Sequence, residues 1–256
     1  MDPKDPAVRV SLLRDQTIQL LDKALSEIRQ AHPNAPGKML ARSYTAQYLL
    51  TEAKEYVEAS WDLLKAGRSR ASLCTSRWVL EAALNLLWVN AAGPAQVDSR
   101  LRLLEAEALR LDAARLEGLA DMNPDPNQAK EYKALAATER DRLKRIVPKT
   151  GWPLKSLDFR IKSIMKYLQA KSMSNPYDWY RVCCAAAHPG LELWRRFCDA
   201  PGGAMVTSRP PDEVEVARRM AAAATVNLVG GAYTLTGKRD CTGLITLWKN
   251  KIVPLL

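Results

Sequence analysis

Histidine and phenylalanine are rare in this chain, with two of each among 256 residues. The sequence also has no glycine-rich phosphate loop, no H-E-x-x-H motif and no cysteine or histidine spacing typical of zinc. We therefore expect no bound metal ion and no other cofactor. No apolar run approaches the roughly 18 residues that a membrane span needs, so the sequence predicts no membrane association.

Cysteine usage and the first residues indicate the compartment. The five cysteines are odd in number and include no C-x-x-C pair, which is typical of reduced thiols. Residues 1–6 are charged and lack the apolar core of a secretory signal. These features predict a cytoplasmic protein. Its net charge of +10 favours contact with nucleic acid, although arginines that cover solvated helix faces produce the same balance.

Apolar residues recur at spacings of three and four along most of the chain, and the alternating pattern of strands is nearly absent. The sequence therefore predicts an all-α, multi-helix bundle that forms a single domain over residues 1–256. Within it we expect a helical extension at 1–39, a core at 40–200 and C-terminal helices at 201–256.

Turn and capping residues predict where the helices begin and end. Gly67 should end a helix that starts near residue 40, and Asp125 should cap another, with Gln128 closing a capping box. The small residues 221–224 and the Gly230-Gly231 pair predict close packing against another helix, within the chain or across a dimer.

The helix predicted at 69–90 is apolar nearly all the way round, so it should be central in the bundle. Arg77 lies within its apolar stripe, and Glu81 follows one turn later, at the spacing where the two can pair. Two interpretations stay open for these residues. They form a buried structural pair, or they support a charged site on the facing helix.

Arg181 and His188 are the strongest candidates for a functional site. Seven residues span about two helical turns, so both side chains fall on one stripe about 10 Å apart along the axis. A cation and a titratable base then share one line, with Tyr180 beside them. The alternative is structural, because Pro189 ends the helix at His188, and the imidazole can bond the freed carbonyls.

The densest positive charge lies on two successive predicted helices. The second of these begins near residue 157 and should point its cations largely outward, namely Arg160, Lys162, Lys166 and Lys171. Few aromatic residues alternate with these cations, so a merely solvated face is the alternative to a nucleic-acid surface. The candidate nucleic-acid-binding residues are Arg140, Arg142, Lys144, Arg145 and Lys149.

Two blocks of sequence, Ser76 to Ala82 and Tyr180 to Gly190, carry a family resemblance. They resemble a bacterial helical family of unknown function, with an S/A-R-x-x-x-E-A helix followed later by Y-R-x-x-S-x-x-x-H-P. The matching order and spacing cover residues 44–194. That family is in turn similar to the HEPN superfamily of helical bundles, whose active members cut RNA without metal, commonly as dimers. The resemblance implies a HEPN-like core with additional helices at both ends.

The resemblance also implies roles for individual residues. His188 would exchange a proton with the RNA 2′-hydroxyl, Arg181 would hold the phosphate in the transition state, and Tyr180 would orient one of them. The implied partners are RNA and a second copy of the chain. The implied setting is a bacterial defence or toxin-antitoxin system, and the implied activity is metal-independent endoribonuclease.

Two residues depart from the resembled patterns. Val182 follows the arginine where HEPN nucleases usually have a polar residue, and Cys184 stands where the bacterial family usually has serine. The rival function is therefore a non-catalytic helical interaction module. Its structural core polar residues would be Arg77, Glu81, Arg181 and His188.

Overall fold

The structure is a computed structural model that describes residues 5–31, 37–93, 95–147, 151–166, 176–187, 211–237 and 246–255. Within these ranges the chain is helical and contains no strand, so the all-α prediction is confirmed. None of the helices in the described part is long and apolar enough to cross a membrane. The elements are α1 (Pro6–Ala31), α2 (Gly37–Lys65), α3 (Ser69–Asn90), α4 (Val97–Met122), α5 (Pro126–Ile146), α6 (Leu157–Lys162), α8 (Pro176–Ala187), α10 (Pro211–Leu235), η2 (Trp248–Ile252) and η3 (Val253–Leu255).

The chain forms two compact units. Unit 1 combines residues 1–87 with 165–256, and unit 2 comprises residues 88–164. The sequence predicts one domain with a core at 40–200, whereas here unit 2 is inserted between the two halves of unit 1. Helical periodicity reports which face of a helix is buried, but it does not report which helices share a core.

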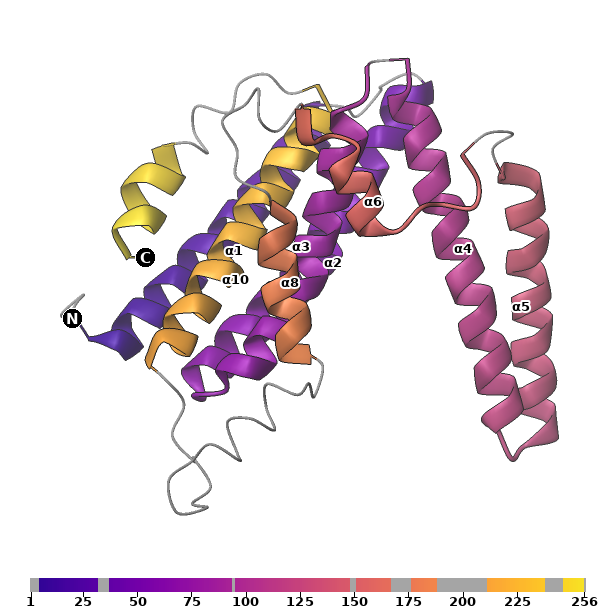
Figure 1. The fold of residues 1–256 in the computed structure, drawn as a ribbon, viewed down its shortest axis with the longest axis horizontal. Helices are drawn as coiled ribbons and strands as arrows, with labels where there is room; N and C mark the ends of the chain where they lie inside the picture. Colours follow the sequence, from indigo (N-terminus) through magenta and orange to yellow (C-terminus); the bar gives the residue numbers. More distant parts are fainter. Residues whose placement is uncertain are drawn as a thin grey trace. The chain divides into compact units, whose positions relative to one another are not determined.

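In unit 1, helices α1, α2 and α10 contact one another and run side by side (Figure 1). Two ion pairs show that α1 and α2 are antiparallel, because Lys54 meets Asp22 at 2.7 Å while Arg14 meets Asp62 at 3.0 Å. The Tyr233 hydroxyl of α10 donates to a carboxylate oxygen of Glu27 on α1. Apolar residues at helical spacing fill the space between these helices, and they include Leu13, Leu20, Leu21, Ile28, Leu50, Val57 and Trp61.

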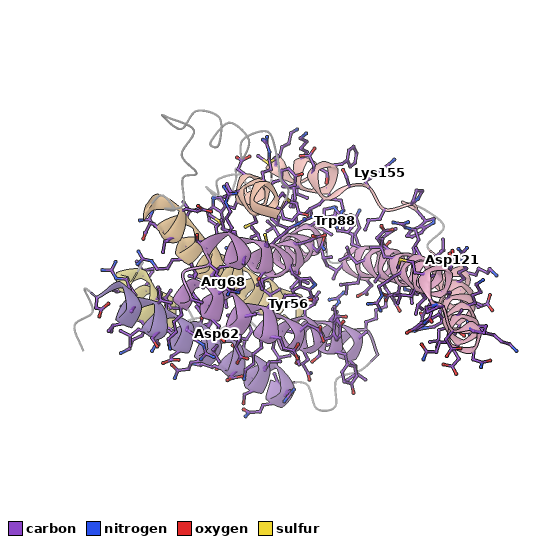
Figure 2. All side chains as sticks on the ribbon, turned by 90° about the horizontal axis from the view of Figure 1, so that it is seen from below. Tyr56, Asp62, Arg68, Trp88, Asp121 and Lys155 are labelled. Atoms are coloured by element: carbon purple, nitrogen blue, oxygen red, sulfur yellow. The ribbon has the colours of Figure 1, made fainter. Side chains whose placement is uncertain are left out.

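Helix α3 contacts α2, α8 and α10 of unit 1. These contacts confirm its central position. On one side, the buried Ser60 hydroxyl of α2 lies 2.8 Å from the hydroxyls of both Ser72 and Ser76. Next to them the Trp78 ring stacks on Tyr56 of α2, with centroids 4.6 Å apart (Tyr56 is labelled in Figure 2). These contacts fix α3 on α2 through both polar and aromatic pairs.

The small residues of α10 allow close approach within the chain. A β-carbon built on Gly231 would lie 2.9 Å from the β-carbon of Leu86 on α3, closer than side chains pack. Ala221, Ala222 and Ala224 on the same helix are buried. The close packing predicted for this segment is therefore confirmed within unit 1.

The predicted end of α2 is confirmed. Gly67 has φ +70°, its amide donates to the Leu64 carbonyl at 2.9 Å, and the Arg68 amide donates to the Leu63 carbonyl at 2.7 Å. These two bonds make a Schellman motif, which requires the left-handed conformation that glycine adopts at little cost.

The start of α5 is only partly as predicted. Asp125 caps the helix by accepting from the Asn127 amide at 2.9 Å. The capping box is absent, because the Asp125 amide donates to the Asn123 side chain at 2.9 Å and Gln128 accepts from the Asn123 amide group at 3.1 Å. Asn123 thus takes the place that the sequence predicts for Gln128.

In unit 2, α4 and α5 form an antiparallel hairpin (Figure 1). Ion pairs join the two helices, from Arg140 to Glu117 at 2.6 Å and from Lys133 to Asp121 at 3.9 Å. Ala136 is the only buried residue of α5. This hairpin therefore has a thin apolar interface and depends partly on charge.

Helix α6 corrects two expectations. It ends at Lys162 and is followed by a turn at 163–164, whereas the sequence predicts a helix that continues toward Lys171, and Arg160 is buried instead of pointing outward. The Arg160 Nε donates to the Lys155 carbonyl at 3.0 Å, and its guanidinium carbon lies 5.4 Å from the Trp88 ring centroid (Trp88 and Lys155 are labelled in Figure 2). A carbonyl and an aromatic face together stabilise the buried cation, so it does not need to reach solvent.

Candidate functional site

Helix α8 begins at Pro176 and carries Tyr180 and Arg181 in succession. Consecutive residues point about 100° apart around a helix, so neighbours can face different surroundings. Tyr180 is buried, at 8% exposed, whereas Arg181 is exposed. His188 immediately follows the last residue of α8 and lies outside the described residues.

The Tyr180 hydroxyl connects α8 to α3. It accepts hydrogen bonds from Arg77 Nε at 3.3 Å and Nη2 at 3.1 Å, and it donates to Glu81 Oε2 at 3.1 Å. The guanidinium carbon of Arg77 also lies 5.3 Å from the Tyr180 ring centroid. Arg77 and Glu81 are both half-buried and are bridged by the phenol instead of forming a direct ion pair. We call this arrangement the Arg77–Tyr180–Glu81 bridge.

Burial and charge fix the protonation state of the bridge. Burial raises the pKa of Tyr180, and the nearby Glu81 carboxylate raises it further, although the hydrogen bond from Arg77 opposes both effects. The bond to Tyr180 raises the pKa of Arg77, against the effect of burial. At neutral pH the phenol therefore keeps its proton and the guanidinium keeps its charge. Tyr180 can donate a hydrogen bond here, but it cannot serve as a base.

Three cysteines lie around the bridge. Cys184 is one turn after Tyr180 on α8 and interacts with both Tyr180 and Arg77, while Cys74 lies on the α3 side. Burial raises the pKa of Cys183 to about 12, so this thiol is protonated at neutral pH. A thiol is a poor nucleophile in that form, which excludes Cys183 as a thiolate catalyst.

Arg181 is exposed on α8 next to the bridge. Among the described residues, no carboxylate lies within ion-pair distance of its guanidinium. Val182 follows it and is also exposed, at 42%. Because Tyr180 is held against α3, the rotation of α8 about its axis is set, and Arg181 is left in water with its charge available.

The cations of α5 lie on its exposed surface, and carboxylates pair with most of them. Arg140 binds both oxygens of Glu117 at 2.7 Å, Arg142 meets Glu139 at 3.0 Å and Lys144 meets Asp141 at 2.9 Å. The bond from Arg140 lowers the pKa of Glu117, and the bond from Lys144 lowers that of Asp141. These pairs reduce the positive field that a phosphate would meet.

Arg145 and Lys149 are the other two candidate nucleic-acid-binding cations. Arg145 donates from Nε to the Asp141 carbonyl at 3.2 Å and remains exposed. Lys149 lies outside the described residues. Of the candidate cations on α5, Arg145 is thus the one whose hydrogen bond goes to a backbone carbonyl instead of a carboxylate.

The hydrogen bonds between Tyr180 and the pair Arg77 and Glu81 could not be predicted from either block of sequence alone. Arg77, Glu81 and Tyr180 each stand out in the sequence, but no local pattern joins residues that are about 100 positions apart. The position of Cys184 beside Tyr180 follows from their spacing of four on one helix, which could have indicated it. Within the described residues, no group of three or more histidine, cysteine, aspartate and glutamate side chains could hold a metal ion.

The chain matches no protein-family model, no curated protein and no solved structure.

Proposed function

We propose that the protein is a cytoplasmic RNA-binding protein with a HEPN-like core that cleaves single-stranded RNA without a metal ion. The proposal depends on one observation above all, the solvated Arg181 on a helix that the Arg77–Tyr180–Glu81 bridge holds in place. A guanidinium that is free of carboxylate partners can bind a phosphate through two parallel hydrogen bonds.

In this mechanism His188 removes the proton from a ribose 2′-hydroxyl, and the 2′-oxygen attacks the adjacent phosphorus. The bond from phosphorus to the 5′-oxygen breaks, and that oxygen takes up a proton from the imidazolium of His188 or from water. The products are a 2′,3′-cyclic phosphate and a 5′-hydroxyl. Arg181 stabilises the negative charge that develops on the phosphate oxygens. Tyr180, Arg77 and Glu81 act as positioning residues, because their hydrogen bonds are already made to one another.

The test is cleavage of end-labelled single-stranded RNA in excess chelator. We expect His188→Ala to lower the rate by about 10²-fold or more, and Arg181→Ala by about 10²-fold. The matched control is Arg219→Ala, since Arg219 is another exposed arginine of unit 1, and its loss should leave the rate unchanged. Circular dichroism of each variant separates loss of activity from loss of fold. Cleavage that survives both site substitutions would exclude this assignment.

A non-catalytic interaction module is the second candidate. The bridge supports it, because Arg77, Tyr180 and Glu81 satisfy one another without any substrate. In that case chelator-resistant cleavage is absent from the purified protein. His188→Ala then lowers the melting temperature, as expected for a residue that caps the end of a helix.

A further inference from the structure

Three of the five cysteines lie where α3 and α8 meet, and two of the three reach solvent. Cys74 on α3 and Cys184 on α8 are half-buried, whereas Cys183 is fully buried. The proposed cleavage mechanism uses none of these thiols. A half-exposed thiol beside a cation is the setting in which cysteines react with oxidants, so the pair that reaches solvent has a chemistry of its own.

Cys74 and Cys184 lie on the two helix faces that meet each other. On α3, Cys74 is three residues before Arg77, so both lie on the face toward α8. On α8, Cys184 is four residues after Tyr180, so both lie on the face toward α3. The Arg77–Tyr180–Glu81 bridge joins these two faces, and the two helices lie side by side (Figure 1).

The contacts between α3 and α8 also fix the relative direction of the two helices. Tyr180 on α8 donates a hydrogen bond to Glu81 on α3. Three residues later on α8, Cys183 interacts with Cys74, which is seven residues earlier than Glu81 on α3. Later residues of α8 therefore meet earlier residues of α3, and the helices are antiparallel.

The hydrogen bond between Tyr180 and Arg77 sets the level of the two half-exposed thiols along the helix axes. Cys184 lies about 6 Å beyond Tyr180 along α8, at about 1.5 Å per residue. Cys74 lies about 4.5 Å from Arg77 along α3, in the same direction because the helices are antiparallel. The two thiols are therefore at nearly the same level on facing sides, which is the placement that a disulfide requires.

The surroundings of Cys184 make it the thiol that reacts first. Its side chain interacts with the Arg77 guanidinium and with Tyr180. A neighbouring guanidinium stabilises the thiolate, which is the form that attacks oxidants. Cys183 differs, because it is fully buried and burial raises its pKa to about 12.

We propose that Cys184 and Cys74 form a redox site, in which hydrogen peroxide converts the two thiols into an intramolecular disulfide between α8 and α3. The Cys184 thiolate attacks one peroxide oxygen, the O–O bond breaks, and the leaving hydroxide takes up the thiol proton to become water. Cys184 is then a sulfenic acid. The Cys74 thiolate attacks the Cys184 sulfur, the S–O bond breaks, and the hydroxide leaves as a second water with the proton of Cys74.

The two sulfurs together lose two electrons, and these electrons reduce the peroxide. A thiol reductant reverses the reaction by exchange, so the covalent link between α3 and α8 is reversible. This inference does not depend on RNA cleavage, because it concerns thiols that the cleavage mechanism does not use.

Peptide mapping of the full chain without reductant tests the disulfide. After treatment with hydrogen peroxide and alkylation of the remaining thiols, trypsin should release residues 71–77 joined to residues 182–195. Dithiothreitol should separate the two peptides. Cys198 and Cys241 fall in other tryptic peptides, so their oxidation does not obscure the result. The joined peptides should come from protein that runs as a monomer on a non-reducing gel.

Single substitutions assign the two sulfurs. Cys184→Ser should lower the yield of joined peptides by at least about 10-fold, whereas the matched control Cys183→Ala should leave the yield unchanged. In Cys74→Ser the sulfenic acid of Cys184 should persist, and dimedone should trap it. Circular dichroism checks the fold of each variant, and fragmentation of the joined wild-type peptides locates the bond without any substitution. The proposal is overturned if peroxide yields no joined peptides, if these occur only in covalent dimers, or if the bond is on Cys183.

Discussion

Replacing Tyr180 with phenylalanine isolates the Arg77–Tyr180–Glu81 bridge, because it removes the hydroxyl and keeps the ring. The lost interactions are one bond donated to a carboxylate and the bonds accepted from a guanidinium. Buried hydrogen bonds to charged groups contribute about 1.5 to 3 kcal/mol each. Arg77 and Glu81 are only half-buried and regain water in the variant, so we expect a total loss of about 2 kcal/mol.

A loss of that size should lower the Tm by about 4 to 8 °C for a protein of this length. The assay is urea and thermal unfolding followed by far-ultraviolet circular dichroism. Tyr44→Phe is the matched control, because the Tyr44 side chain is 62% exposed and its hydroxyl should contribute almost nothing. A double-mutant cycle with Glu81→Gln should give an interaction energy of about 1 kcal/mol.

One result would show that the Arg77–Tyr180–Glu81 bridge does not stabilise the fold. If Tyr180→Phe unfolds within about 0.5 kcal/mol of the wild type, the phenol does not hold α8 on α3. The rotation of α8 would then have another cause, and the exposure of Arg181 would need a different explanation.

Two other predictions concern packing and charge. In urea unfolding, Gly231→Ala should destabilise unit 1 by about 1 to 3 kcal/mol, because the new methyl group meets the Leu86 β-carbon at 2.9 Å. Gly230→Ala has open space around the new methyl group, so it should be neutral or stabilising by up to about 1 kcal/mol. If α5 contacts RNA, replacing both Arg142 and Arg145 with alanine should reduce the slope of the log RNA-binding constant against log salt concentration by about 2, measured by fluorescence anisotropy. An unchanged slope would assign both residues to a solvated surface.

Local sequence signals predicted the helices and most of their ends. The spacing of apolar residues identified α1, α2 and α10, each of which has a buried side, and the apolar residues all round α3 identified it as central. Gly67 ends α2 and Asp125 caps α5, because each satisfies backbone groups within a few residues. Such signals can be identified in the sequence because the capping residue and the backbone groups that it satisfies lie within the same few residues. One failure was also local, because the Asn123 side chain takes the role that the sequence predicts for Gln128 at the start of α5.

The candidate site was predictable only residue by residue. The sequence singled out Arg77, Glu81, Tyr180 and Arg181 as scarce polar groups in apolar helices, and it left open whether Arg77 and Glu81 pair with each other. The packing of α8 on α3 decided that a phenol 103 residues away from Arg77 bridges the two. It also decided that Arg181 faces water while its neighbour Tyr180 does not.

The same distinction explains the cationic helices and the domain count. A run of arginines looks alike whether it is solvated, buried or paired, and only the neighbouring elements determined that Arg160 lies against Trp88 and that Arg140 binds Glu117. Amino-acid spacing sets which face of a helix avoids water. Which helix covers that face depends on contacts between segments far apart in the chain, and those contacts form only when the tertiary structure does.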